Sequence, residues 1–301
     1  NSKRVYDSAV NFARGFNSQH MLKNKNPIDY SVQIISENAT TGANTLTPIK
    51  SCSKFDEDES EEYVKAFPKD YLKQAAERIN DSNPGLNITT SDVQTMYVWC
   101  AFEINVRGRS DMCDVLTTQE LINFSYYDDL TEFYEHGPGN SLGKTVGSVL
   151  FNASLQLLTE ENPSNKIWLS FTHDTDISNF LAAVGLFDTG KNMTNKHPEF
   201  QGHVFHKSWF VPQGARVYTE KLSCNDTSYV RYVVNDAVIP INGCSSGPGL
   251  SCELNDFVEY ANGRIGDLDY VQSCEIKENT ALTFYWDYKD KQYSAIPSAK
   301  F

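Results

Sequence analysis

One segment constrains the fold of this chain more than any other, because its apolar period changes at a single dipeptide. Over Lys166–Phe171 apolar side chains alternate with polar or partly polar ones, as in a buried strand. After His173–Asp174 the apolar residues from Ile177 to Val184 recur at three and four positions, as on one face of a helix. A strand-to-helix turn lies at the carboxyl edge of a sheet, where ligands bind in open α/β sheets and where free helix N–H groups favour anions. The dipeptide is therefore a candidate for binding a phosphoryl oxygen and delivering a proton.

The charge balance argues against a nucleic-acid partner. The 301 residues include 39 acidic and 26 basic side chains, a formal net charge of −13, whereas neutralising the phosphates of a strand requires a basic face. Hydrophobic residues make up 40% of the chain, enough for a substantial core. No apolar run is long enough to span a membrane. We therefore expect a globular protein with neither nucleic-acid nor membrane partners.

Sequons and cysteines together predict an oxidising, extracellular compartment. The glycosylation tripeptide Asn-X-Ser/Thr, with X not proline, occurs at Asn38, Asn80, Asn87, Asn123, Asn152, Asn192 and Asn225. Seven cysteines accompany these sequons, a combination typical of secreted glycoproteins with disulfides, although a cytosolic chain with incidental sequons is the alternative. Spacing favours a Cys100–Cys113 pair and a Cys244–Cys252 pair but does not fix the connectivity, and an odd number of cysteines leaves one unpaired within the chain.

The rest of the pattern predicts a sheet domain interrupted by helices. Ser2 can cap an opening helix, and residues 30–35 have the composition of a strand. Helices are expected over Tyr71–Ile79, Ser91–Asn105, Thr117–Glu135 and Ser141–Leu158, capped by their first residues where these are Ser or Thr. Further strands are expected over Ala215–Leu222, Tyr229–Val234 and Ala237–Ile241, the last two joined by a tight Asn235–Asp236 turn.

These elements predict the α/β fold class, with a mixed, mainly parallel sheet flanked by helices and a smaller α-helical subdomain. Residues 1–50 are expected to form part of the α/β domain, residues 51–162 the helical subdomain, and residues 163–301 the remainder of the α/β domain. The acidic run Asp56–Glu62 is typical of a solvated helix start and needs no functional interpretation.

Three further motifs accompany the His173–Asp174 turn in a fixed order. Ser2–Ala9 opens the chain, Glu135–Asn140 has the sequence Glu-His-Gly-Pro-Gly-Asn, and Val230–Asp236 comes later, followed by Pro240 and Cys244. The ordered set resembles the histidine acid phosphatase family, and in particular its secreted yeast acid phosphatases and phytases. The resemblance runs nearly from end to end of the chain.

The resemblance implies roles for particular residues. In this family a histidine nucleophile accepts the phosphoryl group while a carboxylic acid protonates the departing alcohol. Asp174 then corresponds to the proton donor, His173 would hydrogen-bond a phosphoryl oxygen, and Arg4 would bind phosphate through its planar guanidinium. No cofactor and no metal is implied. The alternatives are a solvated charge for Arg4 and a structural helix cap for the His-Asp pair.

The family signature Arg-His-Gly-X-Arg-X-Pro, which carries the nucleophile, does not occur in the chain. The other histidines stand in different contexts: His20, His136, His197, His203 and His206. We therefore expect the chain to be the C-terminal two-thirds of a longer protein and to be inactive alone. The family's disulfide pattern implies the pairs Cys52–Cys274, Cys100–Cys113 and Cys244–Cys252, and a bond from Cys224 to the N-terminal segment.

The implied function is a secreted acid phosphomonoesterase of the extracellular, cell-wall or periplasmic space. It acts on a phosphomonoester, with a phytase and a broad-specificity phosphatase both left open. The alternative is a non-catalytic secreted glycoprotein that keeps the fold and binds anions. His136 is expected either near the cleft or in a Gly-rich turn. No metal site is predicted at His197, His203 and His206, because no carboxylate or cysteine completes a ligand set in the sequence around them.

Overall fold

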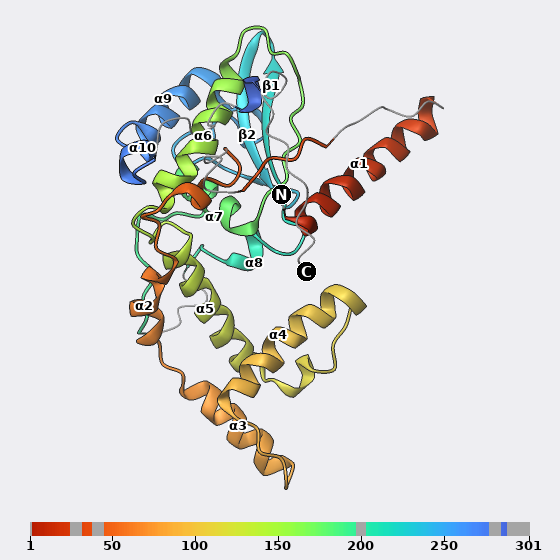
Figure 1. Ribbon diagram of the computed structural model, residues 1–301, viewed down its shortest axis with the longest axis vertical. Coiled ribbons are helices and arrows are strands. Elements are labelled where there is room, and N and C mark those ends of the chain that lie inside the picture. The colour runs from red at the N-terminus through yellow and green to blue at the C-terminus, as the bar shows by residue number, and fades with distance from the viewer. Residues whose placement is uncertain (1, 25–31, 38–44, 197–202, 277–283, 288–301) are drawn as a thin grey trace. The chain divides into compact units, whose positions relative to one another are not determined.

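The computed structural model describes residues 2–24, 32–37, 45–196, 203–276 and 284–287 (Figure 1). The chain forms two compact units. The first unit joins residues 1–56, 141–186 and 216–301, and the second joins residues 57–140 and 187–215. The helical portion expected over residues 51–162 overlaps the second unit but also includes a helix of the first, and the domain boundaries stay a prediction.

The first unit combines helices with a small sheet. Its elements are α1 (Lys3–Asn24), the 3-10 helix η2 (Pro48–Ser51), α6 (Gly143–Thr159), α7 (Asp174–Val184), β1 (Val217–Cys224), β2 (Thr227–Val234), β3 (Ala237–Ile239), the 3-10 helix η5 (Pro248–Leu250), β4 (Cys252–Glu253), α9 (Leu254–Ile265), α10 (Tyr270–Ser273) and α11 (Phe284–Asp287).

The sheet has the order β1-β2-β3, with β4 pairing β2. Tight turns join consecutive strands, with Asn225 and Asp226 between β1 and β2 and Asn235 and Asp236 between β2 and β3, all four at positive φ. Asn and Asp tolerate this left-handed backbone better than other non-glycine residues. The side chain of Tyr232 on β2 is fully buried. The predicted tight hairpin at residues 235 and 236 is confirmed.

The α/β class is confirmed, but all strand pairs of the described chain are antiparallel. The mainly parallel arrangement expected from the sequence is therefore wrong for this sheet. Two segments expected to be strands, residues 30–35 and 166–171, are not strands where the structure describes them, and residues 30–31 lie outside the described residues. A strand requires a neighbour that pairs its backbone N–H and C=O groups, and the described residues form no ladder along these two segments.

Helices α6 and α7 cross at very close range beside the sheet (Figure 1). Gly147 of α6 makes this approach possible, because a Cβ atom at that position would clash with the backbone carbonyl of Asn179 on α7. Phe151 of α6 then contacts Phe180 of α7 edge-on, at 6.3 Å between ring centroids. The helix that carries the His-Asp turn is therefore fixed by backbone-to-backbone packing.

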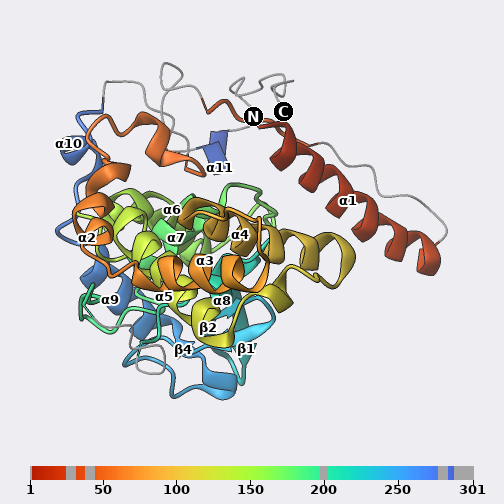
Figure 2. The same ribbon diagram turned by 90° about the horizontal axis from the view of Figure 1, so that it is seen from below.

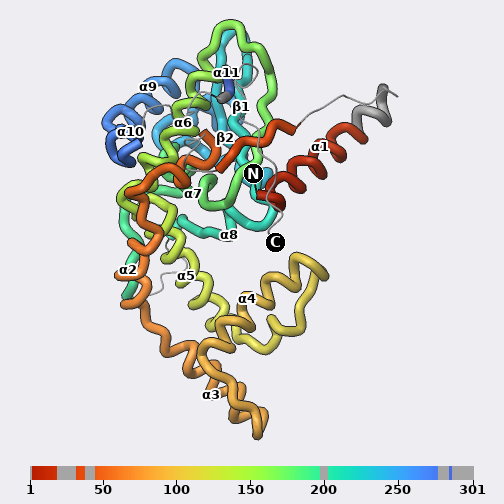
Figure 3. Tube along the Cα trace, viewed as in Figure 1, coloured from red at the N-terminus to blue at the C-terminus, as the bar shows by residue number. Residues whose placement is uncertain are grey.

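An aromatic cluster joins these helices to the sheet and to α9. Phe151 contacts Phe257 of α9, and Tyr232 of β2 contacts both Phe180 and Phe257, with centroids 6.1 to 6.3 Å apart. All four rings are buried, and aromatic side chains contribute large apolar areas to a core. Two further contacts join the segment around η2 to the segment around α10: Cys52 is bonded to Cys274, and the Tyr270 hydroxyl donates to the Pro48 carbonyl at 2.7 Å. The backbone of these segments can be followed in Figure 3.

The second unit is helical; its residues 57–140 fall within the range expected for the helical subdomain, and its residues 187–215 do not. Its elements are the 3-10 helix η3 (Glu57–Ser60), α2 (Glu61–Lys65), α3 (Asp70–Ser82), α4 (Thr90–Arg107), the 3-10 helix η4 (Cys113–Val115), α5 (Thr118–Glu135) and α8 (Lys207–Phe210). Helices α3 and α4 lie side by side (Figure 2). Arg78 of α3 reaches Glu120 at the start of α5, with Nη2 and Oε2 2.7 Å apart.

The helix starts confirm one of the predicted caps and correct two. Thr117 caps α5 in a capping box with Glu120, as expected. Thr89, not Ser91, caps α4, because Thr89 forms its own capping box with Asp92. Helix α6 begins at Gly143 after Leu142, so Ser141 is not its cap. The sequence offered several hydroxyl residues at these starts, and the reciprocal carboxylate three residues later decides which one is used.

Candidate active site

His173 and Asp174 lie at the start of α7, where the sequence places them. His173 is the residue before the helix, with φ −93° and ψ 160°, and its side chain makes no capping hydrogen bond. Asp174 is the first helical residue and is exposed. Because Asp174 is not at the cap position and the His173 ring does not cap, the structural-cap interpretation is not supported. An exposed carboxyl and an imidazole thus stand together at a helix N-terminus, where free N–H groups favour anions.

Glu37 is the partner of His173, and sequence reasoning missed it. Its Oε2 lies 3.2 Å from His173 Nε2, and its Oε1 accepts a hydrogen bond from the Ser2 backbone N–H at 3.0 Å. The bond with His173 outweighs partial burial and holds the pKa of Glu37 well below its usual range. An ionised Glu37 can only accept, so Nε2 carries a proton and the ring is held with Nδ1 left for a ligand. No signal in the sequence marks this pair, whose members are 136 residues apart.

Arg4 lies in the first turn of α1, next to the segment that contacts this site. Ser2, two residues earlier, is hydrogen-bonded to Glu37, and Phe12 of the same helix contacts Phe171 at 5.5 Å between centroids. The Arg4 side chain is exposed. The chain from Ser2 through Glu37 to His173 therefore brings the start of α1 to the His-Asp turn. The role of the guanidinium itself stays a prediction.

A second carboxyl of the same helix turn, Asp176, is buried, with 6% of its surface exposed. Its Oδ2 lies 2.9 Å from Thr172 Oγ1, which also lies 2.6 Å from the Leu46 carbonyl oxygen. Burial raises the pKa of Asp176 to about 7, against the lowering effect of the Thr172 hydroxyl and the His173 imidazole. The sequence Asp-Thr-Asp shows two similar residues, whereas the fold makes one exposed acid and one buried acid.

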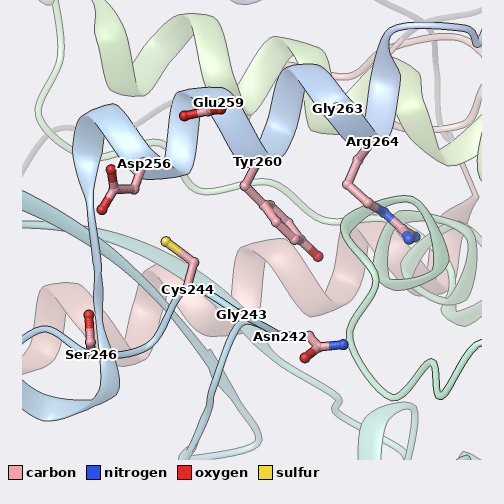
Figure 4. A pocket seen from close by; sticks show the side chains of 9 residues that line it. All are labelled: Asn242, Gly243, Cys244, Ser246, Asp256, Glu259, Tyr260, Gly263 and Arg264. Carbon is pink, nitrogen blue, oxygen red and sulfur yellow. The ribbon is translucent and has the colours of Figure 1, made fainter.

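Helix α9 holds the opposite end of α7. Arg264 donates to the Ala182 carbonyl at 2.7 Å and to the Ala183 carbonyl at 3.0 Å, and the Tyr260 hydroxyl donates to the Val184 carbonyl at 2.6 Å. These donors satisfy the last carbonyls of α7, and the guanidinium complements the negative end of the helix. The same two side chains line a hollow of about 550 Å³ (Figure 4). The cationic group of this hollow is thus already engaged in fixing the site helix.

Comparison with known proteins agrees with this geometry. Residues 1–235 match the family described as the histidine phosphatase superfamily (branch 2). The chain belongs to this superfamily. It is 47% identical over 299 residues to a repressible acid phosphatase of Saccharomyces cerevisiae, an alignment that covers 98% of this chain and 62% of that protein. It is also 46% identical to a phytase of Candida albicans, with 98% of this chain and 63% of that protein covered.

A solved structure shares the fold of this histidine phosphatase. The crystal structure of the phytase from D. castellii superposes with a TM-score of 0.92 at 44% identity, covering 99% of this chain and 64% of that one. The expected resemblance to yeast acid phosphatases and phytases is therefore confirmed. The chain spans somewhat less than two thirds of the length of the relatives and of the solved chain that it matches.

The three disulfides implied by the family resemblance are present: Cys52–Cys274, Cys100–Cys113 and Cys244–Cys252. Each joins residues of a single unit. Cys224, at the end of β1, is an exposed free cysteine. Its bond to another segment stays a prediction.

The predicted glycosylation sites differ in accessibility. Asn38 lies outside the described residues, and the side chains of four sites are exposed: Asn87, Asn152, Asn192 and Asn225. Asn123 is half-buried on α5. Asn80 is also half-buried, and its side-chain amide donates to the Ile88 carbonyl at 2.9 Å and accepts from the Ile88 N–H at 2.8 Å. A glycan on Asn80 would leave this amide nitrogen a single N–H for the bond to Ile88.

His136 lies in the second unit, on the turn that ends α5. It is buried, and its Nδ1 lies 3.7 Å from Glu132 Oε1. Burial opposes protonation of the imidazole, but Glu132 and the neighbouring Glu135 and Glu57 raise the pKa of His136 above its ordinary value. The structure thus places His136 in the Gly-rich turn. A role near the cleft stays a prediction.

The second unit also corrects the expectation that no carboxylate joins the later histidines. Asp129 of α5 does so: its Oδ2 lies 3.0 Å from His203 Nε2 and 3.1 Å from His206 Nδ1, while its Oδ1 accepts from the Lys207 backbone N–H at 2.8 Å. His197 lies outside the described residues. The two imidazole centroids are 4.0 Å apart, closer than the roughly 5 Å expected for two rings bound to one tetrahedral zinc ion. Hydrogen bonds to one shared oxygen therefore account for this cluster.

Among the residues that the structure places, no helix is both long enough and apolar enough to cross a bilayer.

Proposed function

We propose that this chain is the larger part of a secreted acid phosphomonoesterase. The observation that carries the proposal is the start of α7, where the exposed Asp174 follows His173 and the latter is held by Glu37. Membership of the histidine phosphatase superfamily supplies the chemistry that such a turn serves. The helix N-terminus and its dipole add a favourable environment for a phosphoryl group.

In the proposed reaction a histidine of the N-terminal segment attacks phosphorus and forms a phosphohistidine, while the bond from phosphorus to the ester oxygen breaks. Asp174 gives its proton to the departing alkoxide, which leaves as the alcohol. His173, through Nδ1, and the permanently charged Arg4 bind phosphoryl oxygens. Water then attacks the phosphohistidine, with Asp174 accepting a proton, to release phosphate and restore both residues.

The N-terminal segment is proposed to be disulfide-linked to this chain through Cys224. Three features support such a partner: relatives of greater length, the exposed thiol of Cys224, and the exposure of Ile167 and Leu169. These two apolar side chains lie on the extended segment that leads to His173, and side chains of a buried strand are covered by the elements packed on the faces of its sheet. Comparing masses of the intact protein before and after reduction tests the link. A mass that shows Cys224 unpaired in the oxidised protein would contradict it.

The substrate is proposed to be a phosphomonoester, with inositol phosphates as one candidate. Similarity to phytases as well as to acid phosphatases supports both specificities. The net charge of −13 does not attract a polyanion, so a phytase would need a local cationic lining. The pH–rate profiles with phytate and with a simple aryl phosphate distinguish the two.

Secretion to the extracellular, cell-wall or periplasmic space is proposed on the three disulfides and the exposed sequons.

The proposed phosphatase activity is tested by an enzyme assay. The intact protein should release phosphate at acid pH, and this chain alone should not. An intact protein that binds phosphate without hydrolysing any phosphomonoester would favour the alternative, a non-catalytic anion-binding glycoprotein.

A further inference from the structure

The Thr172 hydroxyl stands between two acceptors but has one proton. Its Oγ1 lies 2.6 Å from the Leu46 carbonyl oxygen and 2.9 Å from Asp176 Oδ2. A carbonyl can only accept, so the short contact with Leu46 uses the hydroxyl proton. The contact with Asp176 is then a hydrogen bond only when the carboxyl carries a proton and donates it to Thr172 Oγ1. The geometry is that of a chain running from Asp176 through Thr172 to Leu46.

The surroundings of Asp176 agree with a neutral carboxyl. The side chain is 94% removed from solvent, and its Oδ1 has no hydrogen-bond partner. A carboxylate in such a place would leave a charged oxygen unsatisfied, which costs far more than a neutral group in the same position. Ionisation would also leave Thr172 with two acceptors for one proton.

We propose that Asp176 is a positioning residue that acts as a neutral acid, holding the Thr172–His173 turn to the Leu46 segment only while it is protonated. This inference rests on the proposed function, because the turn that it holds is the one assigned to catalysis. Thr172 is joined to His173 by a peptide bond, and the His173 carbonyl accepts the first helical hydrogen bond from Ile177 at 3.2 Å. A loosened Thr172 therefore changes the position of the imidazole directly.

The charged groups around Asp176 set the pH at which this hold is lost. Burial raises the pKa of Asp176 to about 7, against the lowering effects of the Thr172 hydroxyl, the His173 imidazole and the His173 backbone N–H, and the Glu37 carboxylate raises it further. Helix α6, which packs on α7, has Lys144 as its one titratable residue. Helix α9 packs on α7 and places its Arg264 at the far end of that helix. The chain of hydrogen bonds is thus intact in acid and breaks on the approach to neutral pH.

The first test needs no substrate. Infrared difference spectra between the intact wild-type protein and Asp176→Asn, recorded at about pH 5, should contain the C=O stretch of a protonated carboxyl, because an ordinary aspartate is ionised there. The band should disappear on titration through pH values of about 7. Exposed Asp267→Asn is the matched control and should not remove the band. Absence of a protonated carboxyl that is specific to Asp176 would overturn the proposal.

The second test is the pH profile of kcat/KM for an aryl phosphate. Asn cannot ionise, and its amide still donates to Thr172, so Asp176→Asn should extend the neutral limb of the profile by about one pH unit. A purely structural role would lower kcat/KM without moving the limb, and that result would overturn the proposal. If the wild-type protein hydrolyses no phosphomonoester, the proposed function fails, whereas the infrared test still decides the state of Asp176.

Thr172→Val gives a measurement that does not depend on the folding of Asp176→Asn. Without the Thr172 hydroxyl the Asp176 proton loses its acceptor, and the carboxyl band should shift to the frequency of a free acid. The control is Thr175→Val: Thr175 is half-buried and directly precedes Asp176, and its loss should leave the carboxyl band at the wild-type frequency. A band that is identical in wild-type and Thr172→Val proteins would contradict the hydrogen-bond chain.

Discussion

Histidine and aspartate residues are neighbours in both units of the molecule, and the two places differ in how many of the side-chain polar groups have hydrogen-bond partners. In the second unit Asp129 uses both oxygens: one accepts from His203 and His206, the other from a backbone N–H. Asp129 is 1% exposed. Both carboxylate oxygens thus accept from donors of the same unit, as expected for a group that stabilises the fold.

The turn at the start of α7 has the opposite character. Asp174 is exposed, and His173 is held by Glu37 through one ring nitrogen. The same residue types therefore stabilise one unit and are available for a ligand in the other. The difference between the two places comes from burial and hydrogen-bond saturation, and neither can be read from residue type.

The largest expected effect comes from Asp174 at the start of α7. Asp174→Asn in the intact protein should lower kcat by about 10²–10⁴-fold for substrates with poor leaving groups, because the amide cannot protonate the alkoxide. The melting temperature should change little, since Asp174 is exposed. Steady-state kinetics with an alkyl phosphate measure the effect, and Asp267→Asn is the control. Wild-type turnover in the variant would remove Asp174 from the reaction.

For Asp129 in the second unit, we expect a loss of stability with little change in turnover. Asp129→Ala leaves the buried His206 imidazole, the half-buried His203 imidazole and the Lys207 N–H without their acceptor, a loss of about 3 kcal/mol or more in the free energy of unfolding. Thermal denaturation of the variant and the wild type should reveal it, while kcat per folded molecule stays close to the wild-type value. A chelator should leave the wild-type melting temperature unchanged, because hydrogen bonds account for the cluster. A large chelator-induced drop would instead indicate a bound metal ion.

Arg4 allows a smaller but sharper test of the available site. Arg4→Ala should weaken inhibition by phosphate or vanadate by about tenfold, as expected for the loss of a charged, planar donor to an oxyanion. The matched control is Lys3→Ala: Lys3 carries the same charge in the same helix turn but is paired with Asp7. Equal inhibition constants for the Arg4 variant and the wild type would leave Arg4 as a solvated charge.

The sequence could predict the residues that neighbour each other along the chain better than those that meet in space. The change of period at His173 predicted the turn at the start of α7, and the preference for Ser or Thr at helix starts predicted Thr117 as a cap. Glu37 and Asp129 were missed because their partners lie 136 and 74 or more residues away. The mainly parallel arrangement is wrong for the described sheet for a related reason: residues 166–171 have the composition of a strand, but a strand forms only where a neighbour pairs with it.

Glu37 and Asp176 provide the finest test, because they flank His173 and titrate in opposite senses. The folded-state pKa of Glu37 is lowered, so the stability it contributes is present above its ordinary value of about 4.3 and is lost as the pH falls below that value. The folded-state pKa of Asp176 is raised to about 7, so its contribution is complete below about pH 3.9 and is lost as the pH rises toward 7. Between about pH 4 and neutrality, Glu37 is therefore ionised while Asp176 is protonated.

Glu37→Gln should therefore remove the acid-side slope of the melting temperature, a change of a few degrees below about pH 4. Asp176→Asn should remove the slope between about pH 4 and neutrality and leave the acid side as it is. Melting curves of both variants over this range separate the two contributions. If both variants lost the same slope, the two carboxyls would titrate as one coupled pair, and the turn would have a single pH-dependent contact in place of two.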